Sequence, residues 1–423
     1  MSEETTDTPL LASGADPEPI RFLDEAGDYA PSNTAAEFAD ELSAVGLDDF
    51  KQWYRDMVST RAFDTECTHL QRQGQLALWV PSVGQEGCQV GLARASEPQD
   101  HIFPAYREHL VANVRGVDLL DIAAQFRGVT HGGWDVTDPA NGNVHLYTLV
   151  LGSQTQHATG HALGQVLDAK RRAGDTALDP GEAGTATGEA TMVFYGDGTS
   201  SQGDANEAMV FAASYQTPEV FVVQNNGWAI SVPVTRQSRT PLYRRALGFG
   251  LRAVQIDGND PLAAYAVGRR FLRLAREGHG PGYIEALTYR IGAHTTADDP
   301  TRYRPDGELE AWQQRDPIAR LEAHLRSLGV DDAFFAEVAE TADRQAKAVR
   351  DQILTLPQPE PDSMFAHVYA EPHPRIDEQR AWFAHYESSF EGADATPADA
   401  PASASRPVPH TAAAHGAERG VTA

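Results

Sequence analysis

Two short apolar runs that each end in a polar turn constrain the fold of this chain more than any other feature. The run TMVFYG, residues 191–196, is followed by Asp-Gly, and the run EVFVVQ, residues 219–224, is followed by Asn-Asn-Gly. Between them, residues 204–216 have the spacing of an amphipathic helix. Continuous apolar strands joined by a helix are typical of parallel sheets that are buried on both faces. The pattern therefore predicts an α/β fold.

The same alternation of strand and helix continues along the chain. Residues 251–256 and 283–290 are predicted strands, and residues 261–277 form a predicted helix between them. Further helices are predicted over residues 47–74, 117–128, 157–174, 317–328 and 332–356, of which the last two are expected to pack outside the sheet. We expect a doubly wound, mainly parallel sheet with helices on both faces.

Composition predicts one folded domain between two tails. Residues 1–45 are acidic and are expected to form an N-terminal arm, partly extended and partly disordered, in which residues 19–31 have enough apolar content to dock. Residues 46–390 form the predicted catalytic domain. Residues 391–423 lack periodic apolar side chains and cannot bury enough surface to offset the entropy of ordering, so a disordered C-terminal tail is predicted.

Charge and cysteine content exclude several classes of partner. Asp and Glu number 60 against 34 Lys and Arg, and the resulting charge of -26 repels nucleic acid and anionic membranes alike. Cys67 and Cys88 fall in predicted helices and need not form a disulfide. The sequence has neither a signal peptide nor an apolar run long enough to span a bilayer, so we expect a cytoplasmic protein.

The polar residues at the two strand ends predict a site for a metal ion and a diphosphate. Because the carboxyl ends of parallel strands meet at one edge of a sheet, Asp197 and Asn226 are expected to be neighbours. Their carboxylate and amide oxygens are ligands that Mg²⁺ accepts. Gly196 and Gly198 let the backbone approach a ligand closely.

A helix N-terminus is expected to complete this site. Ser200 or Ser201 is predicted to cap the helix that follows the first turn, and its free N–H groups and dipole suit a diphosphate. Either turn alone is more often a plain turn than a site. The pairing is more informative, because the 26 residues from Thr199 to Gln224 are enough for one helix and one strand.

Gly-Asp-Gly, this interval and Asn-Asn resemble the thiamine diphosphate motif of transketolase, the acetohydroxyacid synthases and the 2-oxo acid dehydrogenases. Longer stretches are similar to the alpha subunit of the thiamine-dependent first component of a 2-oxo acid dehydrogenase complex. These stretches are SVGQEG (82–87), DHIFPAYREH (100–109), GDGTSS to WAIS (196–231) and IEALTYRIGAHTTADDPTRYR (284–304). The last of them looks most like the branched-chain type. The likeness covers about Phe50 to Tyr386.

The resemblance implies a role for ten residues. Asp197, Asn226 and the backbone carbonyl of Trp228 would bind Mg²⁺. Thiamine diphosphate would be held by the remaining set, which is Tyr106, Arg107, Leu151, Gly196, Gly198, Thr199 and His294. Of these, His294 and Tyr106 are the implied catalytic residues, with His294 reaching the diphosphate and the reacting carbon from a mobile loop.

Some positions depart from the family pattern. Gln224 replaces an arginine that contacts the diphosphate in branched-chain relatives, Ala293 replaces a histidine, and Trp228 replaces a tyrosine. Ser153 and Gln154 match positions that hold a potassium ion in branched-chain relatives, although the segment between His145 and Leu151 is shorter here.

One histidine pair has the spacing of a metal site without its other requirements. His157 and His161 stand at i and i+4, but no third ligand is evident from the sequence. We interpret this stretch as a helix packed near the cofactor.

The implied activity is the oxidative decarboxylation of a 2-oxo acid, with a branched-chain acid favoured, and reductive acylation of a lipoyl domain. A separate beta chain would supply the activating glutamate, giving an alpha2-beta2 heterotetramer on a lipoyl-bearing acyltransferase core.

A pyruvate or acetoin dehydrogenase alpha subunit remains an alternative. A non-catalytic assembly paralogue is less consistent with intact Asp197, Asn226, Arg107 and His294. A nicotinamide-binding enzyme is a further alternative, but this sequence lacks the G-x-G-x-x-G motif that such an enzyme has after its first strand.

Overall fold

The computed structural model describes residues 16–128, 133–175, 184–357 and 359–390. The chain divides into two compact units, Met1–Gln358 and Pro359–Ala423. The first unit holds the five-stranded sheet, and the described residues of the second unit, 359–390, form a 3₁₀ helix and one α-helix. The predicted catalytic domain, 46–390, spans parts of both units. The predicted disordered tail, 391–423, lies outside the described residues.

The elements alternate between helix and strand as expected. The strands are β1 (His101–Phe103), β2 (Thr191–Gly196), β3 (Glu219–Asn225), β4 (Trp228–Ala229), β5 (Val232–Pro233), β6 (Arg252–Asp257) and β7 (Gly282–Leu287). The α-helices are α1 (Leu47–Arg72), α2 (Glu86–Ala95), α3 (His109–Val114), α4 (Leu119–Arg127), α5 (Ser153–Arg172), α6 (Gly203–Tyr215), α7 (Val234–Gln237), α8 (Leu242–Gly248), α9 (Pro261–Arg276), α10 (Glu308–Gln313), α11 (Pro317–Ser327), α12 (Asp332–Thr355) and α13 (Pro374–Ser388). The 3₁₀ helices are η1 (Asn33–Leu42), η2 (Pro139–Asn141), η3 (Asp197–Ser201), η4 (Pro300–Arg302) and η5 (Pro361–Phe365).

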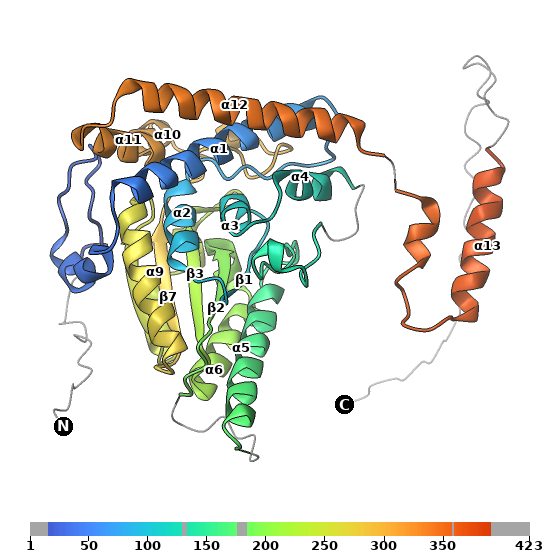
Figure 1. Ribbon diagram of the computed structural model, residues 1–423, viewed down its shortest axis with the longest axis horizontal. Coiled ribbons are helices and arrows are strands. Elements are labelled where there is room, and N and C mark those ends of the chain that lie inside the picture. The colour runs from blue at the N-terminus through green and yellow to red at the C-terminus, as the bar shows by residue number, and fades with distance from the viewer. Residues whose placement is uncertain (1–15, 129–132, 176–183, 358, 391–423) are drawn as a thin grey trace, which may run out of the picture. The chain divides into compact units, whose positions relative to one another are not determined.

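Five strands form one parallel sheet in the order β1-β2-β3-β7-β6 (Figure 1). The register pairs Gly196 with Gln224, which brings the ends of β2 and β3 side by side. The fold class is therefore confirmed. The predicted strand 283–290 is three residues too long, since β7 ends at Leu287 and the side chain of Arg290 bonds to the Trp228 and Ile230 carbonyls instead.

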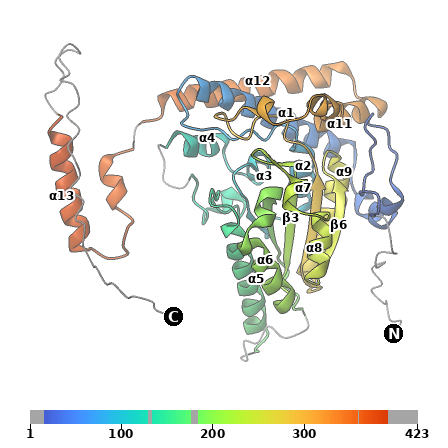
Figure 2. The same ribbon diagram turned by 180° about the vertical axis from the view of Figure 1, so that it is seen from behind.

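Helices cover both faces of the sheet. Alternate side chains of β2 and β3 face two separate cores, because successive residues of a strand point to opposite sides. The first core takes Met192, Phe194, Val220 and Val222 together with residues of α2 and α9, and the second takes Val193, Tyr195, Phe221 and Val223 with residues of α6 and α8. The reverse view shows α5, α6 and α8 over this second face (Figure 2).

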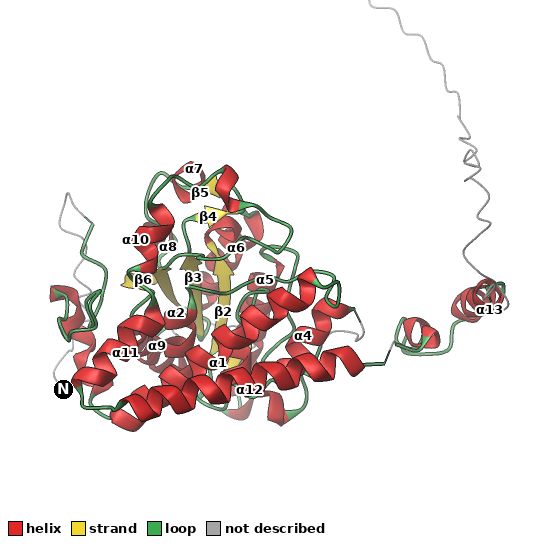
Figure 3. Ribbon diagram, turned by 90° about the horizontal axis from the view of Figure 1, so that it is seen from above, coloured by secondary structure: helices red, strands yellow, loops and turns green. Residues whose placement is uncertain are grey.

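Two long helices and the N-terminal segment close the first core. Helix α12 runs alongside α1 (Figure 3). Ile20 forms a parallel β-bridge with Ile256 of β6. The backbone amides of Phe22 and Leu23 donate to the buried Asp260 carboxylate at 2.5 and 2.9 Å. Among the described residues, no helix is both long and apolar enough to cross a bilayer.

Candidate cofactor-binding site

A cavity of about 160 Å³ opens at the carboxyl ends of β2 and β3. The ten residues to which the resemblance gave a role in binding Mg²⁺ or thiamine diphosphate or in catalysis all line it, namely Tyr106, Arg107, Leu151, Gly196, Asp197, Gly198, Thr199, Asn226, Trp228 and His294. They come from segments up to 188 residues apart, and the parallel register brings the two turns together. Their individual roles stay predictions.

The turn after β2 presents a buried carboxylate. Asp197 Oδ2 accepts a hydrogen bond from Gln237 Nε2 at 2.9 Å. Burial raises the pKa of Asp197 to about 6, against the lowering effect of the Gln237 bond. A carboxylate whose charged form is disfavoured by burial gains from a neighbouring cation. This residue therefore has the chemistry of a metal ligand.

The turn after β3 presents two oxygens. Asn226 Nδ2 donates to Gln85 Oε1 at 3.2 Å, and Asn226 Oδ1 accepts from the Trp228 backbone amide at 3.3 Å. The Trp228 carbonyl accepts from Arg290 Nη1 at 3.0 Å, which uses one of its two lone pairs. The three predicted metal ligands are oxygen donors, as Mg²⁺ requires.

The expected serine cap is wrong. Residues 197–201 form the 3₁₀ helix η3, and α6 begins only at Gly203, with Gln202 as its N-cap and no side-chain cap. The Ser200 hydroxyl donates to the Asp197 carbonyl at 2.6 Å, and the Ser201 hydroxyl lies 3.3 Å from Gln237 Oε1. The hydroxyls thus tighten the turn that carries Asp197 and do not cap the helix.

The cavity wall carries positive charge and, among the described residues, two unpaired buried donors, Gln85 Nε2 and Arg290 Nε. Arg107 and Arg290 are both buried, and burial, followed by the neighbouring Arg107, lowers the pKa of Arg290 to about 10. Gln85 Nε2 is buried without a hydrogen-bond partner among the described residues. An unpaired buried donor beside two guanidinium groups is satisfied by an anionic ligand. A diphosphate fits this donor set.

His294 lies between the two arginines. Its Nδ1 is 3.3 Å from Arg107 Nη2 and 3.3 Å from Arg290 Nη1. Burial, then Arg107 and Arg290, lower the pKa of His294 to about 3, so the imidazole is neutral at physiological pH. Since arginine can only donate, Nδ1 accepts and the proton lies on Nε2. The ring therefore offers an N–H donor.

Gln224, which stands in place of a family arginine, belongs to a buried polar network. Its Oε1 accepts from Gln89 Nε2 at 3.0 Å, and its Nε2 donates to the Glu108 carboxylate. Burial raises the pKa of Glu108. Both the oxygen and the nitrogen of the amide are thus hydrogen-bonded to protein groups, and Arg107 and Arg290 remain as the cations of the cavity wall.

The potassium positions remain a prediction. The Ser153 hydroxyl donates to the Val150 carbonyl at 3.0 Å, and Gln154 Nε2 donates to the Phe194 carbonyl at 3.1 Å. Gln154 Oε1 is buried without a partner among the described residues, so this oxygen is available to a cation.

Sequence reasoning missed three residues of this site. Arg290, Gln85 and Gln237 contact or flank the predicted ligands. Arg290 and Gln85 stand within stretches that resemble the family, so their identity was available. Their contacts were not, because they depend on how loops from β7 and before α2 fold over the cavity.

Two glycines of the cavity make a matched pair for mutagenesis. A Cβ on Gly198 would lie 2.9 Å from Ala229 Cβ, whereas a Cβ on Gly196 would meet no atom within 4 Å. Gly198→Ala is expected to destabilise the protein by about 1–3 kcal/mol through overpacking, while Gly196→Ala leaves the melting temperature unchanged and weakens cofactor binding. Thermal unfolding and calorimetry separate the two effects. Equal melting temperatures for both variants would contradict this packing.

Comparison with known proteins identifies relatives of the chain. The family model described as "Dehydrogenase E1 component" matches residues 54–359. The chain is 42% identical over 329 residues to the 3-methyl-2-oxobutanoate dehydrogenase subunit alpha of Mycobacterium tuberculosis, covering 77% of this chain and 84% of that protein. It is 35% identical over 343 residues to the pyruvate dehydrogenase E1 component subunit alpha of Bacillus cereus, covering 81% and 84%. The corresponding subunit of Acholeplasma laidlawii is 33% identical over 338 residues, covering 77% and 90%.

Proposed function

The chain belongs to the dehydrogenase E1 component family, and we propose on that basis that it is the alpha subunit of a 2-oxo acid dehydrogenase. It takes part in decarboxylation of a 2-oxo acid and acylation of a lipoyl group. A branched-chain substrate is favoured by 42% identity to the 3-methyl-2-oxobutanoate enzyme subunit, against 35% to a pyruvate enzyme subunit. Pyruvate is the second candidate.

The observation that carries this proposal is the donor set of the cavity. Asp197, Asn226 and the Trp228 carbonyl supply oxygen ligands for Mg²⁺, and Arg107 with the unpaired Gln85 amide suits a diphosphate. Thiamine diphosphate, when bound, supplies the electron sink for decarboxylation. The chain's own residues would hold its charged end.

His294 and Tyr106 are the proposed catalytic residues. The two arginines occupy Nδ1 of His294, which leaves the Nε2–H group free to donate to a ligand. The Tyr106 ring lies edge-on to the His294 ring at a centroid distance of 6.3 Å. A neutral N–H group that is already held in place can stabilise developing negative charge by donating a hydrogen bond to it. We therefore assign His294 to the reacting carbonyl or the diphosphate.

A partner chain is proposed to cover the mouth of the cavity. Leu151 and Ile230 line the cavity yet are 37% and 52% exposed, and further exposed apolar side chains stand next to them in sequence at Leu149, Val150 and Val232. Exposed apolar groups around a polar site mark protein interfaces. We assign this rim to a beta chain, in an alpha2-beta2 heterotetramer that serves a lipoyl-bearing acyltransferase core. A cytoplasmic location is part of the proposal, supported by two free buried cysteines.

The single chain is expected to lack decarboxylase activity, because the proposed beta chain supplies the activating glutamate. Adding the cognate beta chain with thiamine diphosphate and Mg²⁺ should give turnover, measured as carbon dioxide release and lipoyl acylation. A panel of 2-oxo acids that includes 3-methyl-2-oxobutanoate and pyruvate ranks the substrates. Full activity from the alpha chain alone, verified free of partner by mass spectrometry, would contradict the proposed assembly.

A further inference from the structure

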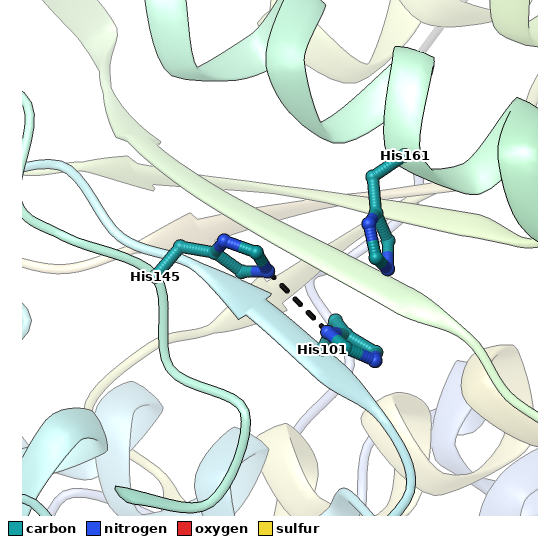
Figure 4. A group of neighbouring side chains, drawn as sticks. All are labelled: His101, His145 and His161. Carbon is teal, nitrogen blue, oxygen red and sulfur yellow. Dashed lines mark hydrogen bonds between the residues drawn. The ribbon is translucent and has the colours of Figure 1, made fainter. Parts of the chain in front are cut away.

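Three histidines from three separate segments meet outside the cofactor cavity. His101 lies in β1, His145 follows η2, and His161 lies in α5. One ring nitrogen of each lies within 4.8 Å of those of the other two. In Figure 4 the rings of His145 and His161 both point toward His101. None of the three is among the residues that line the cofactor cavity.

Backbone contacts fix the positions of these side chains. The His145 amide donates to the Ile102 carbonyl at 2.8 Å, and the Ile102 amide donates to the Asn143 carbonyl at 3.0 Å, which joins this segment to β1. Helix α5 packs against β1 and β2. Sites built on strands and helices hold their ligands more firmly than sites on free loops. The cluster is therefore preorganised.

The spacing of two nitrogens matches a metal centre. His101 Nδ1 and His145 Nε2 are 3.3 Å apart. Two nitrogens bound at about 2.0–2.1 Å to a tetrahedral zinc ion are separated by roughly 3.3 Å. The His161 ring lies 4.2 Å from the His101 ring and 5.4 Å from the His145 ring, centroid to centroid. A His161 ring nitrogen lies within 4.8 Å of a ring nitrogen of each of the other two histidines, so this ring can serve as the third ligand.

The third histidine has an unpaired nitrogen. His161 Nε2 is buried and has no hydrogen-bond partner among the described residues. A hydrogen bond between His101 and His145 alone would account for those two rings, with His145 stacked on Phe103 at 3.8 Å. It would leave His161 Nε2 without a hydrogen-bond partner, which is unfavourable for a buried polar atom. A bound metal ion satisfies all three rings.

The charge state of the cluster suits metal binding. Burial, followed by the neighbouring His161, lowers the pKa values of His101 and His145 to about 4, and burial lowers the pKa of His161. Imidazole must be neutral to ligate a metal. At neutral pH the three rings are therefore uncharged, and each has one nitrogen lone pair that can bind a metal ion.

We propose that His101, His145 and His161 bind one divalent transition-metal ion, with Zn²⁺ as the first candidate and water in the fourth position. Imidazole ligands suit zinc, copper, nickel and iron, whereas Mg²⁺ takes oxygen ligands. The ion cross-links β1, the segment after η2, and α5. The proposal stands independently of the proposed enzymatic function, because it rests on different residues.

The test uses the full chain without a histidine tag, stripped with a chelator and kept in excess Mg²⁺ to occupy oxygen sites. Zn²⁺ alone is titrated by calorimetry, and bound metal is counted by elemental analysis after dialysis. We expect one Zn²⁺ per chain, a higher melting temperature because the ion binds the folded state, and at least tenfold weaker binding by His161→Ala. His157→Ala, an exposed position one turn earlier on α5, is the matched control and should bind as wild type.

Two results would overturn the site. One is the absence of stoichiometric Zn²⁺ binding to wild type. The other is an equal loss in the His157→Ala and His161→Ala variants, which would assign binding to the pair His157 and His161 on α5. His161→Gln, which keeps most of the side-chain volume, provides the same comparison if the alanine variant does not fold, and circular dichroism of each stripped variant checks folding.

Discussion

Asp197→Ala is expected to weaken thiamine diphosphate binding in Mg²⁺ buffer at least a hundredfold, which is about 2.7 kcal/mol. Asp197 is the only carboxylate among the three proposed metal ligands, and its charge offsets the cost of removing water from the ion. Burial disfavours the charged form of the Asp197 side chain in the folded protein. The substitution is therefore not expected to lower the melting temperature of the unliganded chain. Calorimetry gives the affinity, and thermal unfolding gives the stability.

Asp204→Ala is the control for the Asp197 experiment. Asp204 stands in the first turn of α6 and is not part of the cavity lining. It should bind the cofactor as wild type does. Unchanged affinity in the Asp197→Ala variant would remove this residue from the metal site, whereas equal losses in both variants would indicate a general effect of charge.

His294→Ala is expected to lower the turnover of the alpha-beta enzyme at least tenfold, or about 1.4 kcal/mol, with little change in melting temperature. The variant loses the Nε2–H donor that the two arginines orient. The loop itself stays anchored, because Arg107 Nη2 still donates to the backbone carbonyl of residue 294 at 3.0 Å. Steady-state kinetics with the favoured 2-oxo acid measure the effect.

Two further substitutions at His294 separate catalysis from packing. Glutamine places its amide near the position of Nε2 and can donate there, whereas asparagine imitates Nδ1 and can only satisfy the arginines. We expect His294→Gln to retain more turnover than His294→Asn. Equal activity of these two variants, or near-normal activity of the alanine variant, would show that the donor has no catalytic role.

Short, continuous apolar runs explain why most of the sheet was predictable. The predicted β2 and β3 segments match the structure closely because each apolar run is short, fully buried and bounded by turn residues. Strand β1 was missed, because three residues carry no readable period. The predicted strand extended to Arg290 because of the apolar run before it. In the structure the Arg290 side chain donates to the backbone carbonyls of Trp228 and Ile230.

The candidate site was predictable wherever spacing fixed geometry. The interval between the two turns places Asp197 and Asn226 at adjacent strand ends, and both line the cavity. The histidines of α5 show the opposite case, because the i, i+4 spacing of His157 and His161 gave no third ligand and the stretch was interpreted as a packed helix. The true neighbours, His101 and His145, come from distant segments that only the folded sheet brings together.

Helix α1 packs against α12, one of several contacts between segments that are far apart in the sequence, and such contacts affect folding during synthesis. Strand β7 inserts between β3 and β6, and the N-terminal amides of Phe22 and Leu23 close onto Asp260, 238 and 237 residues later. Contacts of such long sequence separation form slowly, since the loop must be closed before any contact repays its entropy. A nascent chain on the ribosome thus exposes the apolar side of α1 until the residues of α12 have emerged. Recombinant production should benefit from co-expressed chaperones, which shield that surface until synthesis is complete.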